Sequence, residues 1–247
     1  MGKVAVVTGA SGGLGQAMCS ALAARGYEVV ATDVRGTDEV LDVTDPEACR
    51  ALALRVQPDV WINNAGVLSH GWAADQPDSA IDLAVRVNFL GVINGSRAAV
   101  AVMRERCSGH VINVGSMASW MVPVGETVYA ATKHAVRAFS VGLAIELKGT
   151  GVHVSVLCPN GILTPMITNV LQDDAAAASF NAKPLQPDAV AARAMQLLDK
   201  PRLVASIPRA TAATARLMGV LPSLNQALSP LLMKMGRAGQ QKMRRNP

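Results

Sequence analysis

The segment Thr8-Gly9-Ala10-Ser11-Gly12-Gly13-Leu14-Gly15 follows the apolar run Val4–Thr8 and precedes residues with helical periodicity. Glycines permit a tight turn and let the backbone approach a ligand, and the N-terminus of the next helix offers unpaired N–H groups to a pyrophosphate. An ordinary strand-to-helix turn can have the same composition, so the segment alone is weak support for nucleotide binding. The rest of the chain decides between the two.

Short β-branched runs alternate with helical patterns along the chain. We expect strands at Val4–Thr8, Glu28–Asp33, Val60–Asn63, Val111–Val114, Val152–Leu157 and Leu203–Ile207. We expect helices over residues 14–25, 46–56, 78–106, 127–148 and 187–199. Nearly continuous apolar strands that alternate with helices predict a parallel sheet covered on both faces, in a doubly wound α/β domain. Only Val34 to Asp38 separates the second strand from a short apolar pair at Val40–Leu41, so we expect an irregular segment there instead of a crossover helix.

The composition is that of a globular chain. Of 247 residues, 50% are hydrophobic and 17% are charged, which suits one large domain or at most two small ones. No apolar stretch reaches the roughly 18 residues of a membrane span, and the N-terminus does not resemble a signal peptide. The four cysteines have no metal-ligand spacing and are interpreted as buried residues of a reduced compartment. We therefore expect a cytoplasmic protein without a metal site.

The net charge of +5 belongs to the end of the chain. Residues 209–247 contain seven lysines and arginines and no acidic residue, whereas residues 1–208 contain 16 basic and 18 acidic ones. We therefore exclude nucleic acid as a partner. The sequence predicts one domain at 1–208 and a basic, apolar, helical extension at 209–247. Four residues are expected to break the extension: Pro222, Pro230, Gly236 and Gly239.

Asp33 ends the second expected strand, 18 residues after Gly15. A carboxylate at this place accepts hydrogen bonds from the hydroxyls of an adenosine ribose and repels a 2′-phosphate. Gly12 supplies no positive charge that would compensate, so the sequence favours NAD over NADP. Arg35, two residues further on, keeps NADP as the alternative.

Tyr129 and Lys133 are four residues apart on an expected helix, so both project from one face. A free phenol has a pKa of about 10 and is a poor base at neutral pH. A neighbouring ammonium and a positive nicotinamide ring would bring that pKa toward neutral. A tyrosine–lysine pair on the surface is the structural alternative, but the chain has only two tyrosines.

Seven motifs occur along the chain in a fixed order. They are Thr8-Gly9-x-x-x-Gly13-x-Gly15, Asp42-Val43, Asn63-Asn64-Ala65-Gly66, Asn88, Ser116 thirteen residues before Tyr129, Lys133, and Pro159-x-x-Ile162-x-Thr164. In order and spacing this set resembles the short-chain dehydrogenase/reductase family, over about residues 1–208. The resemblance implies a Rossmann-type domain with a seven-stranded parallel sheet, and nicotinamide-dependent oxidation of alcohols or reduction of ketones. It also implies a homodimer or homotetramer, and a hydride acceptor that makes a metal unnecessary.

The resemblance assigns catalytic roles to four residues. Tyr129 would be the base in alcohol oxidation and the acid in ketone reduction, and Ser116 would hydrogen-bond the substrate oxygen. Lys133 would hold the nicotinamide ribose and tune Tyr129, and Asn88 would bind a water that links Lys133 to solvent. Ser119 could replace Ser116, but the spacing to Tyr129 favours Ser116.

The resemblance also implies a set of cofactor contacts. The glycine loop would contribute Gly9, Ser11, Gly12, Gly13, Leu14 and Gly15, next to Asp33. Asp42 and Val43 would contact the adenine, and Asn64, Ala65 and Gly66 would line the adenosine side. Pro159, Ile162 and Thr164 would lie under the nicotinamide, although Asn160 separates Pro159 from Gly161 where the family usually has Pro-Gly.

Apolar residues follow these positions and suggest the substrate. They are Met117, Trp120, Met121 and Val122 after Ser116, and Leu68 and Trp72 after the Asn-Ala-Gly turn. With the segment Pro165 to Phe180, which commonly closes over the substrate in this family, they would form an apolar cavity. We expect a lipophilic secondary alcohol or ketone, such as a steroid, retinoid, long-chain acyl or aryl compound. Core packing of the same residues is an equal alternative.

Three functions therefore stay open. The first is an NAD-dependent oxidoreductase of lipophilic alcohols, and the second is an NADPH-dependent ketone or 3-oxoacyl reductase. The third is a non-catalytic nucleotide-binding regulator or scaffold, which needs the glycine loop but no reactive phenol. The extension at 209–247 either packs over the pocket or a subunit interface, or makes peripheral contact with an anionic membrane surface.

Overall fold

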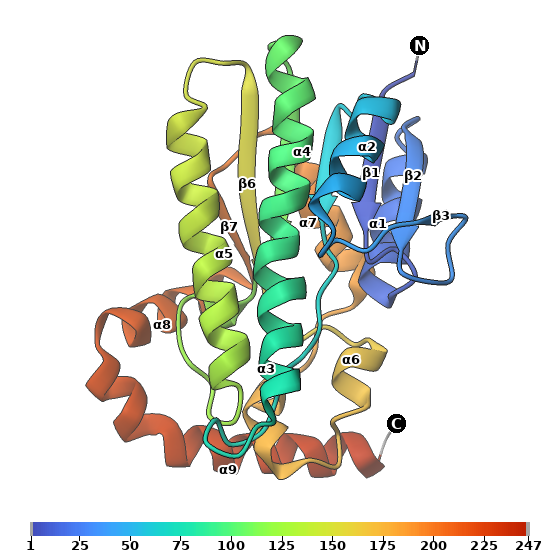
Figure 1. Ribbon diagram of the computed structural model, residues 1–247. Coiled ribbons are helices and arrows are strands. Elements are labelled where there is room, and N and C mark those ends of the chain that lie inside the picture. The colour runs from blue at the N-terminus through green and yellow to red at the C-terminus, as the bar shows by residue number, and fades with distance from the viewer. Residues whose placement is uncertain (1, 246–247) are drawn as a thin grey trace.

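A computed structural model describes residues 2–245, which form a seven-stranded parallel β-sheet between two layers of helices (Figure 1). The strands are β1 (Val4–Thr8), β2 (Glu28–Asp33), β3 (Glu39–Val40), β4 (Val60–Asn63), β5 (Gly109–Val114), β6 (Val152–Pro159) and β7 (Val204–Ile207). Their order across the sheet is β3-β2-β1-β4-β5-β6-β7, so the direction of winding reverses between β1 and β4. This confirms the predicted doubly wound, Rossmann-type architecture, in which ligands bind where the order reverses.

Helices occupy the predicted stretches, and the short helix α6 (Pro165–Thr168) is one that the sequence did not predict. The helices are α1 (Gly13–Ala23), α2 (Pro46–Val56), α3 (Asp78–Val85), α4 (Gly91–Glu105), α5 (Thr127–Glu146), α6, α7 (Pro187–Asp199), α8 (Arg209–Val220) and α9 (Pro222–Arg245). Three further helical turns are η1 (Arg86–Leu90, π-helical), η2 (Met117–Ser119) and η3 (Asp174–Phe180). The π-helical turn joins α3 to α4 inside the helix expected at 78–106, and the sequence did not predict it.

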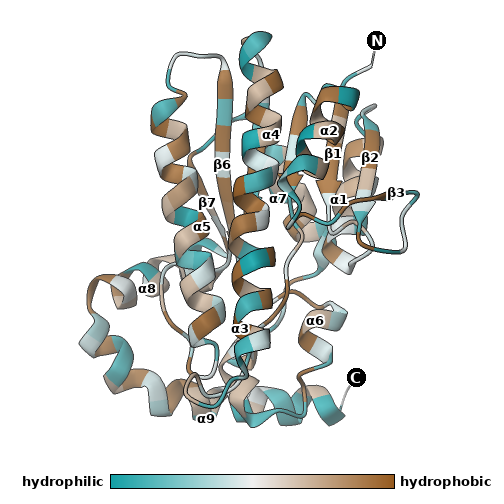
Figure 2. Ribbon diagram, in the orientation of Figure 1, coloured by the Kyte–Doolittle hydropathy of each residue, from teal (hydrophilic) through white to brown (hydrophobic). Residues whose placement is uncertain are grey.

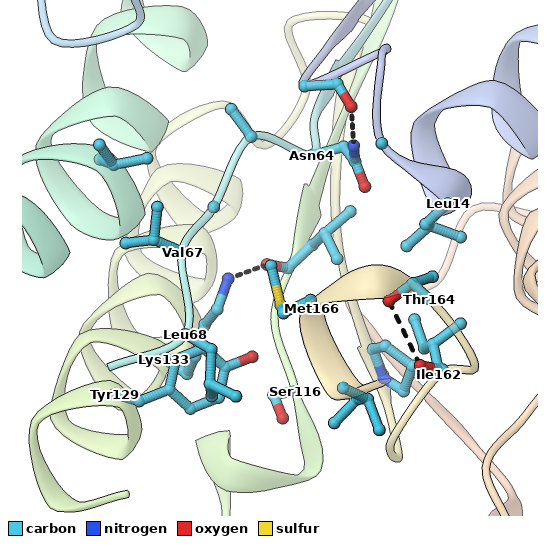
Figure 3. Close-up of a pocket in the computed structure, with 18 of the residues that line it drawn as sticks. Leu14, Asn64, Val67, Leu68, Ser116, Tyr129, Lys133, Ile162, Thr164 and Met166 are labelled. Atoms are coloured by element: carbon cyan, nitrogen blue, oxygen red, sulfur yellow. Dashed lines mark hydrogen bonds between the residues drawn. The ribbon is translucent and has the colours of Figure 1, made fainter. Parts of the chain in front are cut away.

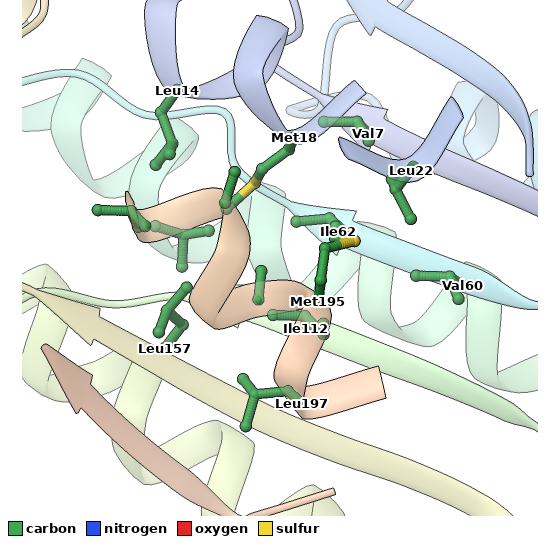
Figure 4. Close-up of a cluster of buried hydrophobic side chains, with 14 of the residues drawn as sticks. Val7, Leu14, Met18, Leu22, Val60, Ile62, Ile112, Leu157, Met195 and Leu197 are labelled. Atoms are coloured by element: carbon green, nitrogen blue, oxygen red, sulfur yellow. The ribbon is translucent and has the colours of Figure 1, made fainter. Parts of the chain in front are cut away.

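Apolar side chains hold the helices on both faces of the sheet. On one face, Met18 and Leu22 of α1 and Leu197 of α7 pack against the strand residues Ile62 and Ile112 (Figure 4). The other face carries a second cluster, contributed by α2, α4 and the strands. In Figure 2 the strand β1 is brown along most of its length, as expected for a strand that is covered on both faces.

The connection after β2 is irregular, as predicted. It leads into the two-residue strand β3, in which Val40 pairs with Asp33 of β2. One prediction about the cysteines is wrong. Cys107 is exposed and Cys19 is only partly buried, because both lie at the ends or outer sides of helices rather than in the core.

A buried polar network links the sheet to α4 and α5. Asn63 accepts a hydrogen bond from the indole N–H of Trp61 (2.8 Å) and donates to Ser96 (3.0 Å) and to Asn113 (2.8 Å). Asn113 in turn donates to Ser140 at 2.9 Å. All five residues are buried, so each of these groups depends on the others for its hydrogen bonds.

His110 makes the fold sensitive to acid. It lies buried on β5 with its Nε2 2.9 Å from the hydroxyl of Ser155, and burial together with the charge of His153 lowers its pKa from 6.5 to about 4. Between pH 6.5 and 4 the unfolded chain therefore binds a proton at this residue that the folded chain does not bind, whereas above pH 6.5 neither form binds it. We expect the free energy of unfolding to fall by about 3 kcal/mol between pH 6.5 and 4 from this group alone.

Urea denaturation at a series of pH values measures this loss. Substitution of His110 by Gln is expected to flatten the dependence of the unfolding free energy on pH. His134→Gln, which changes a partly buried histidine of α5, is expected to leave that dependence unchanged. An unchanged slope in His110→Gln would contradict the assignment.

Of the predicted extension, the described residues 209–245 form two helices, α8 and α9, that pack on the domain. The predicted breaks at Pro230, Gly236 and Gly239 are wrong, because all three lie inside α9. Pro230 cannot donate to the carbonyl of Gln226, and the Ser229 hydroxyl donates to that carbonyl instead, at 2.8 Å. Of the four, Pro222 alone stands at a boundary, where α9 begins.

The two glycines of α9 are contact points. A Cβ atom at Gly236 would overlap the carbonyl oxygen of Ala177, and one at Gly239 would overlap that of Phe180. Gln240, which is buried, donates to the carbonyl of Asp173 at 2.8 Å. Helix α9 therefore lies directly against η3, along the lower edge of the molecule in Figure 1. Among the helices of residues 2–245, none combines the length and apolar character needed to cross a membrane.

Candidate active site

The glycine loop after β1 is built so that its backbone is open to a ligand. Gly9 has a φ of +65°, and a Cβ atom there would lie 2.7 Å from the Cα of Ala65. A Cβ atom at Gly15 would overlap the Gly9 carbonyl. Helix α1 begins at Gly13, and its N-cap residue Gly12 makes no side-chain bond to the first turn. The N-terminal N–H groups of α1 are thus left for an anionic group, as in a pyrophosphate site.

The turn after β4 braces this loop. The amide of Asn64 donates to the carbonyls of Thr8 and Gly9, each at 3.0 Å, and the backbone N–H of Ala65 donates to the Thr8 hydroxyl at 3.1 Å. Asn64 is therefore a support of the glycine loop as well as part of its wall. Both turns lie at the carboxyl ends of neighbouring strands, where the strand order reverses.

Asp33 faces the same loop from the end of β2. Its Oδ2 accepts hydrogen bonds from the Ser11 backbone N–H (3.1 Å) and hydroxyl (2.5 Å), and its Oδ1 accepts one from the Val34 N–H (2.7 Å). The carboxylate remains partly exposed and lines the cavity described next. Arg35 is exposed and does not line that cavity.

A cavity of about 620 Å³ extends from the glycine loop to α5 (Figure 3). Every cofactor contact expected from the sequence lines it. These residues are Gly9, Ser11, Gly12, Gly13, Leu14, Gly15, Asp33, Asp42, Val43, Asn64, Ala65, Gly66, Tyr129, Lys133, Pro159, Ile162 and Thr164. The structure thus brings together residues from five strand ends that are up to 155 positions apart in the sequence.

Ser116 and Tyr129 face each other at the far end of the cavity (Figure 3). Ser116 caps η2: its hydroxyl accepts from the Ala118 N–H, and its own N–H donates to the Ser119 hydroxyl, both at 3.1 Å. Ser119 is fully buried and does not line the cavity, whereas Ser116 does. The geometry therefore favours Ser116 over Ser119 as the serine that meets a ligand.

The pKa of Tyr129 differs from the prediction. Burial and the negative charge of Glu126 raise the pKa of the phenol above its ordinary value, and a hydrogen bond with Ser116 lowers it only in part. The Lys133 ammonium lies 5.7 Å from the centre of the Tyr129 ring and donates to the Val114 carbonyl at 2.9 Å. The predicted shift toward neutral is thus not produced by these side chains alone, because burial and the charge of Glu126 both raise the pKa of the phenol.

Lys133 is itself buried beside the cavity. Burial lowers the pKa of its ammonium to about 8, since the charged form loses its hydration there. A side chain that titrates this close to neutral can be charged or neutral in the working pH range. It can therefore exchange a proton as well as hold a hydroxyl group.

Asn88 lies in the π-helical turn η1, behind the cavity wall. Its amide exchanges two hydrogen bonds with the backbone of Val67, at 2.8 and 2.9 Å, and donates to the Thr132 hydroxyl at 3.3 Å. A Cβ atom at Gly66 would meet both the Asn88 amide oxygen (3.2 Å) and the Lys133 ammonium (3.8 Å), so the three groups are close together. Asn88 thus fixes the turn after β4, which lies close to Lys133, and its water-binding role stays a prediction.

The predicted apolar wall is correct in part. Leu68, Met117 and Met121 line the cavity. Trp120 does not, because its ring lies between the guanidinium groups of Arg137 and Arg216, at 4.1 and 4.6 Å from the ring centre. Two further residues lie outside the wall and are exposed: Trp72 and Val122.

Sequence reasoning missed several polar residues of the wall, among them Glu126 and Ser179. Glu126 stands three residues before Tyr129, which is the helical spacing that places it on the same side of α5. That spacing was a usable signal for Glu126. Ser179 had none, because η3 is placed at the cavity by contacts with residues distant in the sequence, in α9 and at the start of α5.

A family model described as short chain dehydrogenase matches residues 3–175 of the chain. The chain belongs to the short-chain dehydrogenase family. The 3-oxoacyl-acyl-carrier-protein reductase FabG of Escherichia coli K12 is 32% identical to it over 192 residues, which cover 70% of this chain and 78% of that protein. A probable oxidoreductase of Mycobacterium tuberculosis, EphD, is 36% identical over 184 residues, 65% of this chain. The match spans only 31% of that mycobacterial protein.

Solved structures of this family share the fold. A short-chain dehydrogenase/reductase from Burkholderia phymatum in complex with NAD superposes with a TM-score of 0.80 at 26% identity, covering 90% of this chain and 95% of that one. Actinorhodin polyketide ketoreductase with NADPH gives a TM-score of 0.76 at 26% identity, covering 83% and 95%. This short-chain dehydrogenase therefore shares its fold with family members that were solved with NAD and with NADPH.

Proposed function

We propose that this short-chain dehydrogenase transfers a hydride between NAD and a lipophilic secondary alcohol or ketone. The observation that carries the proposal is the meeting of Ser116, Tyr129 and Lys133 at one end of a cavity that has the glycine loop at its other end. A phosphate cradle beside a phenol, a hydroxyl and an ammonium suits hydride transfer coupled to proton transfer.

The residues present fit a dinucleotide. A Cβ atom at Gly9 or Gly15 would clash with the neighbouring backbone, so the tight turn requires glycine at both positions. The free N–H groups of α1 suit a pyrophosphate. Asp33 and Asp42 would then lie on the adenosine side, with Ile162 and Thr164 on the nicotinamide side. The cofactor, when bound, supplies the hydride acceptor or donor.

The side chains of the protein would handle the proton and the oxygen. In alcohol oxidation the Tyr129 Oη takes the hydroxyl proton, and the Ser116 hydroxyl hydrogen-bonds the substrate oxygen as charge develops on it. Lys133 holds the ribose hydroxyls and favours the phenolate, which counteracts the effect of burial on the pKa of Tyr129. In ketone reduction the same groups act in reverse, with Tyr129 as the acid.

The position of Asp33 supports the choice of NAD. The negative charge of this partly exposed carboxylate would repel a 2′-phosphate. Arg35, whose positive charge could attract one, does not line the cavity. We expect the wild-type protein to bind NAD more tightly than NADP, and Asp33→Ala to reduce the ratio of the two affinities by about 10-fold or more. Titration of each nucleotide by fluorescence measures the ratio.

The control is Asp38→Ala, which removes an exposed carboxylate of the same connection that does not line the cavity. This variant is expected to keep the wild-type ratio. Tighter binding of NADP by the wild-type protein would favour the second candidate function, an NADPH-dependent ketone or 3-oxoacyl reductase. The identity with FabG and the fold shared with an NADPH-bound ketoreductase support that alternative.

The apolar wall supports a lipophilic substrate. Leu68, Met117, Met121, Met166 and Ile167 offer no fixed charge to a phosphate or carboxylate of a substrate. Steroids, retinoids, long-chain acyl and aryl compounds are the candidates, and a panel of such alcohols followed by cofactor absorbance ranks them. A cytoplasmic location, a homo-oligomer and peripheral membrane contact through residues 209–247 stay predictions.

A further inference from the structure

Glu126 is a buried carboxyl group at the substrate end of the cavity, and the proposed function gives it no role. The residue is 3% exposed and lines the cavity together with Tyr129. The preceding residue, Gly125, lies so close to the Ala175 carbonyl that a Cβ atom there would overlap it. Glu126 is therefore held in place between α5 and η3.

The protein uses only part of the hydrogen-bonding capacity of this carboxyl group. Within residues 2–245 its side-chain partner is the hydroxyl of Ser179, and no lysine, arginine or histidine lies within ion-pair distance. It does not cap α5 either. A carboxylate offers about four acceptor sites, so most of them remain unused. A buried carboxylate without such partners is costly, and burial accordingly raises the pKa of Glu126 to about 7.

The unused acceptor sites lie near the reacting position. Glu126 and Tyr129 are three residues apart at the start of α5, which places their side chains on one face. They are close enough for the charge of Glu126 to raise the pKa of Tyr129. The cavity wall around them includes Met117, Met121 and Ala178, which are apolar. A buried carboxylate next to apolar side chains orients a ligand that carries a matching donor.

We infer that Glu126 determines substrate specificity by accepting a hydrogen bond from a second, non-reacting hydroxyl group of the substrate. The inference rests on the proposed function, because it takes the reacting hydroxyl to lie at Tyr129. It narrows the substrate class to diols and hydroxyketones with an apolar body. A site built for a hydroxyl group disfavours the analogue that lacks it, since the buried acceptor is then left unpaired.

A purely structural role makes a different prediction. If the Glu126 carboxyl served only to tie η3 to α5, loss of the Ser179 hydroxyl would disturb the cavity as much as loss of the carboxyl. If Glu126 receives the substrate, Ser179→Ala leaves the acceptor in place. The two roles are therefore separated by comparing Ser179→Ala with substitutions of Glu126.

The experiment uses three pairs of alcohols that differ only in a second hydroxyl at increasing distance. The pairs are 1,4-pentanediol with 2-pentanol, 1,5-hexanediol with 2-hexanol, and 1,6-heptanediol with 2-heptanol. The ratio of kcat/KM for diol over alcohol is measured with NAD and with NADP. The proteins are the wild type, Glu126→Leu, Glu126→Gln, Ser179→Ala and, as a matched control, Glu146→Leu. Glu146 is exposed at the other end of α5.

We expect one spacing to be favoured by the wild type, and Glu126→Leu to lower that ratio by about tenfold or more. Glu126→Gln, which keeps one oxygen acceptor and nearly the same shape, should give an intermediate ratio. Ser179→Ala and Glu146→Leu should keep the wild-type ratio. A wild type that favours no diol, or a preference that survives in Glu126→Leu, overturns the inference, as does an equal loss in Ser179→Ala.

Failure of the proposed function gives a distinct result. If the wild type binds a nicotinamide cofactor but oxidises none of the six alcohols, the proposed activity on such alcohols fails. Saturation-transfer difference NMR on the same pairs then tests Glu126 without turnover. A stronger signal for one diol than for its alcohol, lost in Glu126→Leu, supports the inference, and equal signals overturn it. Thermal unfolding of each variant identifies any that fail to fold, and Glu126→Gln replaces Glu126→Leu in that case.

Discussion

Replacement of Tyr129 by phenylalanine is expected to lower turnover by about 10² or more while the affinity for the cofactor stays within the wild-type range. The variant keeps the ring between Ser116 and Lys133 and removes only the hydroxyl that would carry the proton. Turnover is measured with the most active alcohol of the panel, and affinity by nucleotide fluorescence. Retained affinity with lost turnover is also what separates an oxidoreductase from a nucleotide-binding scaffold.

The chain offers a matched control for this variant. Tyr27 is the other tyrosine, it is partly exposed, and it does not line the cavity. Tyr27→Phe is expected to turn over at the wild-type rate. If Tyr129→Phe did so too, the proton would have to travel by another group, and the assignment of Tyr129 would be wrong.

Substitution of Asn63 by alanine is expected to have the largest effect on stability, a loss of about 3–5 kcal/mol in the free energy of unfolding. The change leaves the buried indole N–H of Trp61 without its acceptor and removes the donor to Ser96 and Asn113. Water cannot replace these bonds, because all four residues are buried. Urea denaturation followed by circular dichroism measures the loss.

Asn225→Ala is the comparison for this effect. Asn225 donates a single hydrogen bond to the Val122 carbonyl near the surface, so water can take over its role. We expect this variant to lose less than about 1 kcal/mol. Equal losses in the two variants would contradict the view that the network makes Asn63 special.

The sequence was sufficient to predict the sheet and the positions of the glycine loop and Asp33, because these depend on local patterns. The glycine loop follows β1 because a tight turn, a close approach to Ala65 and an open helix start all need glycine within eight residues. Asp33 could be placed beside the loop because a parallel neighbour of β1 must end at the same edge. Neither inference required knowledge of distant packing.

The substrate side could not be predicted in the same way. The pKa of Tyr129 depends on how deeply the phenol is buried and on the charge of Glu126. Neither of these can be deduced from the spacing between Tyr129 and Lys133. Trp120 lies next to the site in the sequence but turns away from the cavity, to a position between Arg137 and Arg216. Arg216 comes from α8, so that outcome depended on an element almost a hundred residues away.

The prolines and glycines after Pro208 show the same limit. Pro230 was expected to end a helix, but the Ser229 hydroxyl supplies the missing donor and the helix continues. Gly236 and Gly239 were expected to break a helix. In the structure they lie inside α9, where the absence of a side chain lets the backbone of η3 pack closely against the helix. A glycine in a sequence is compatible both with a helix break and with a close packing contact, and the choice depends on which segment packs against it.

Because α9 packs directly on η3, these two segments could be exchanged together for those of another dehydrogenase. The match to the family model ends at residue 175, at the start of η3, and the wall beyond it is joined to the rest through backbone contacts and bonds such as that of Gln240 to Asp173. Grafting η3 and α9 together from another dehydrogenase would therefore give an engineer a new selectivity on an unaltered catalytic frame. Grafting η3 without its helix would leave two overlapping surfaces.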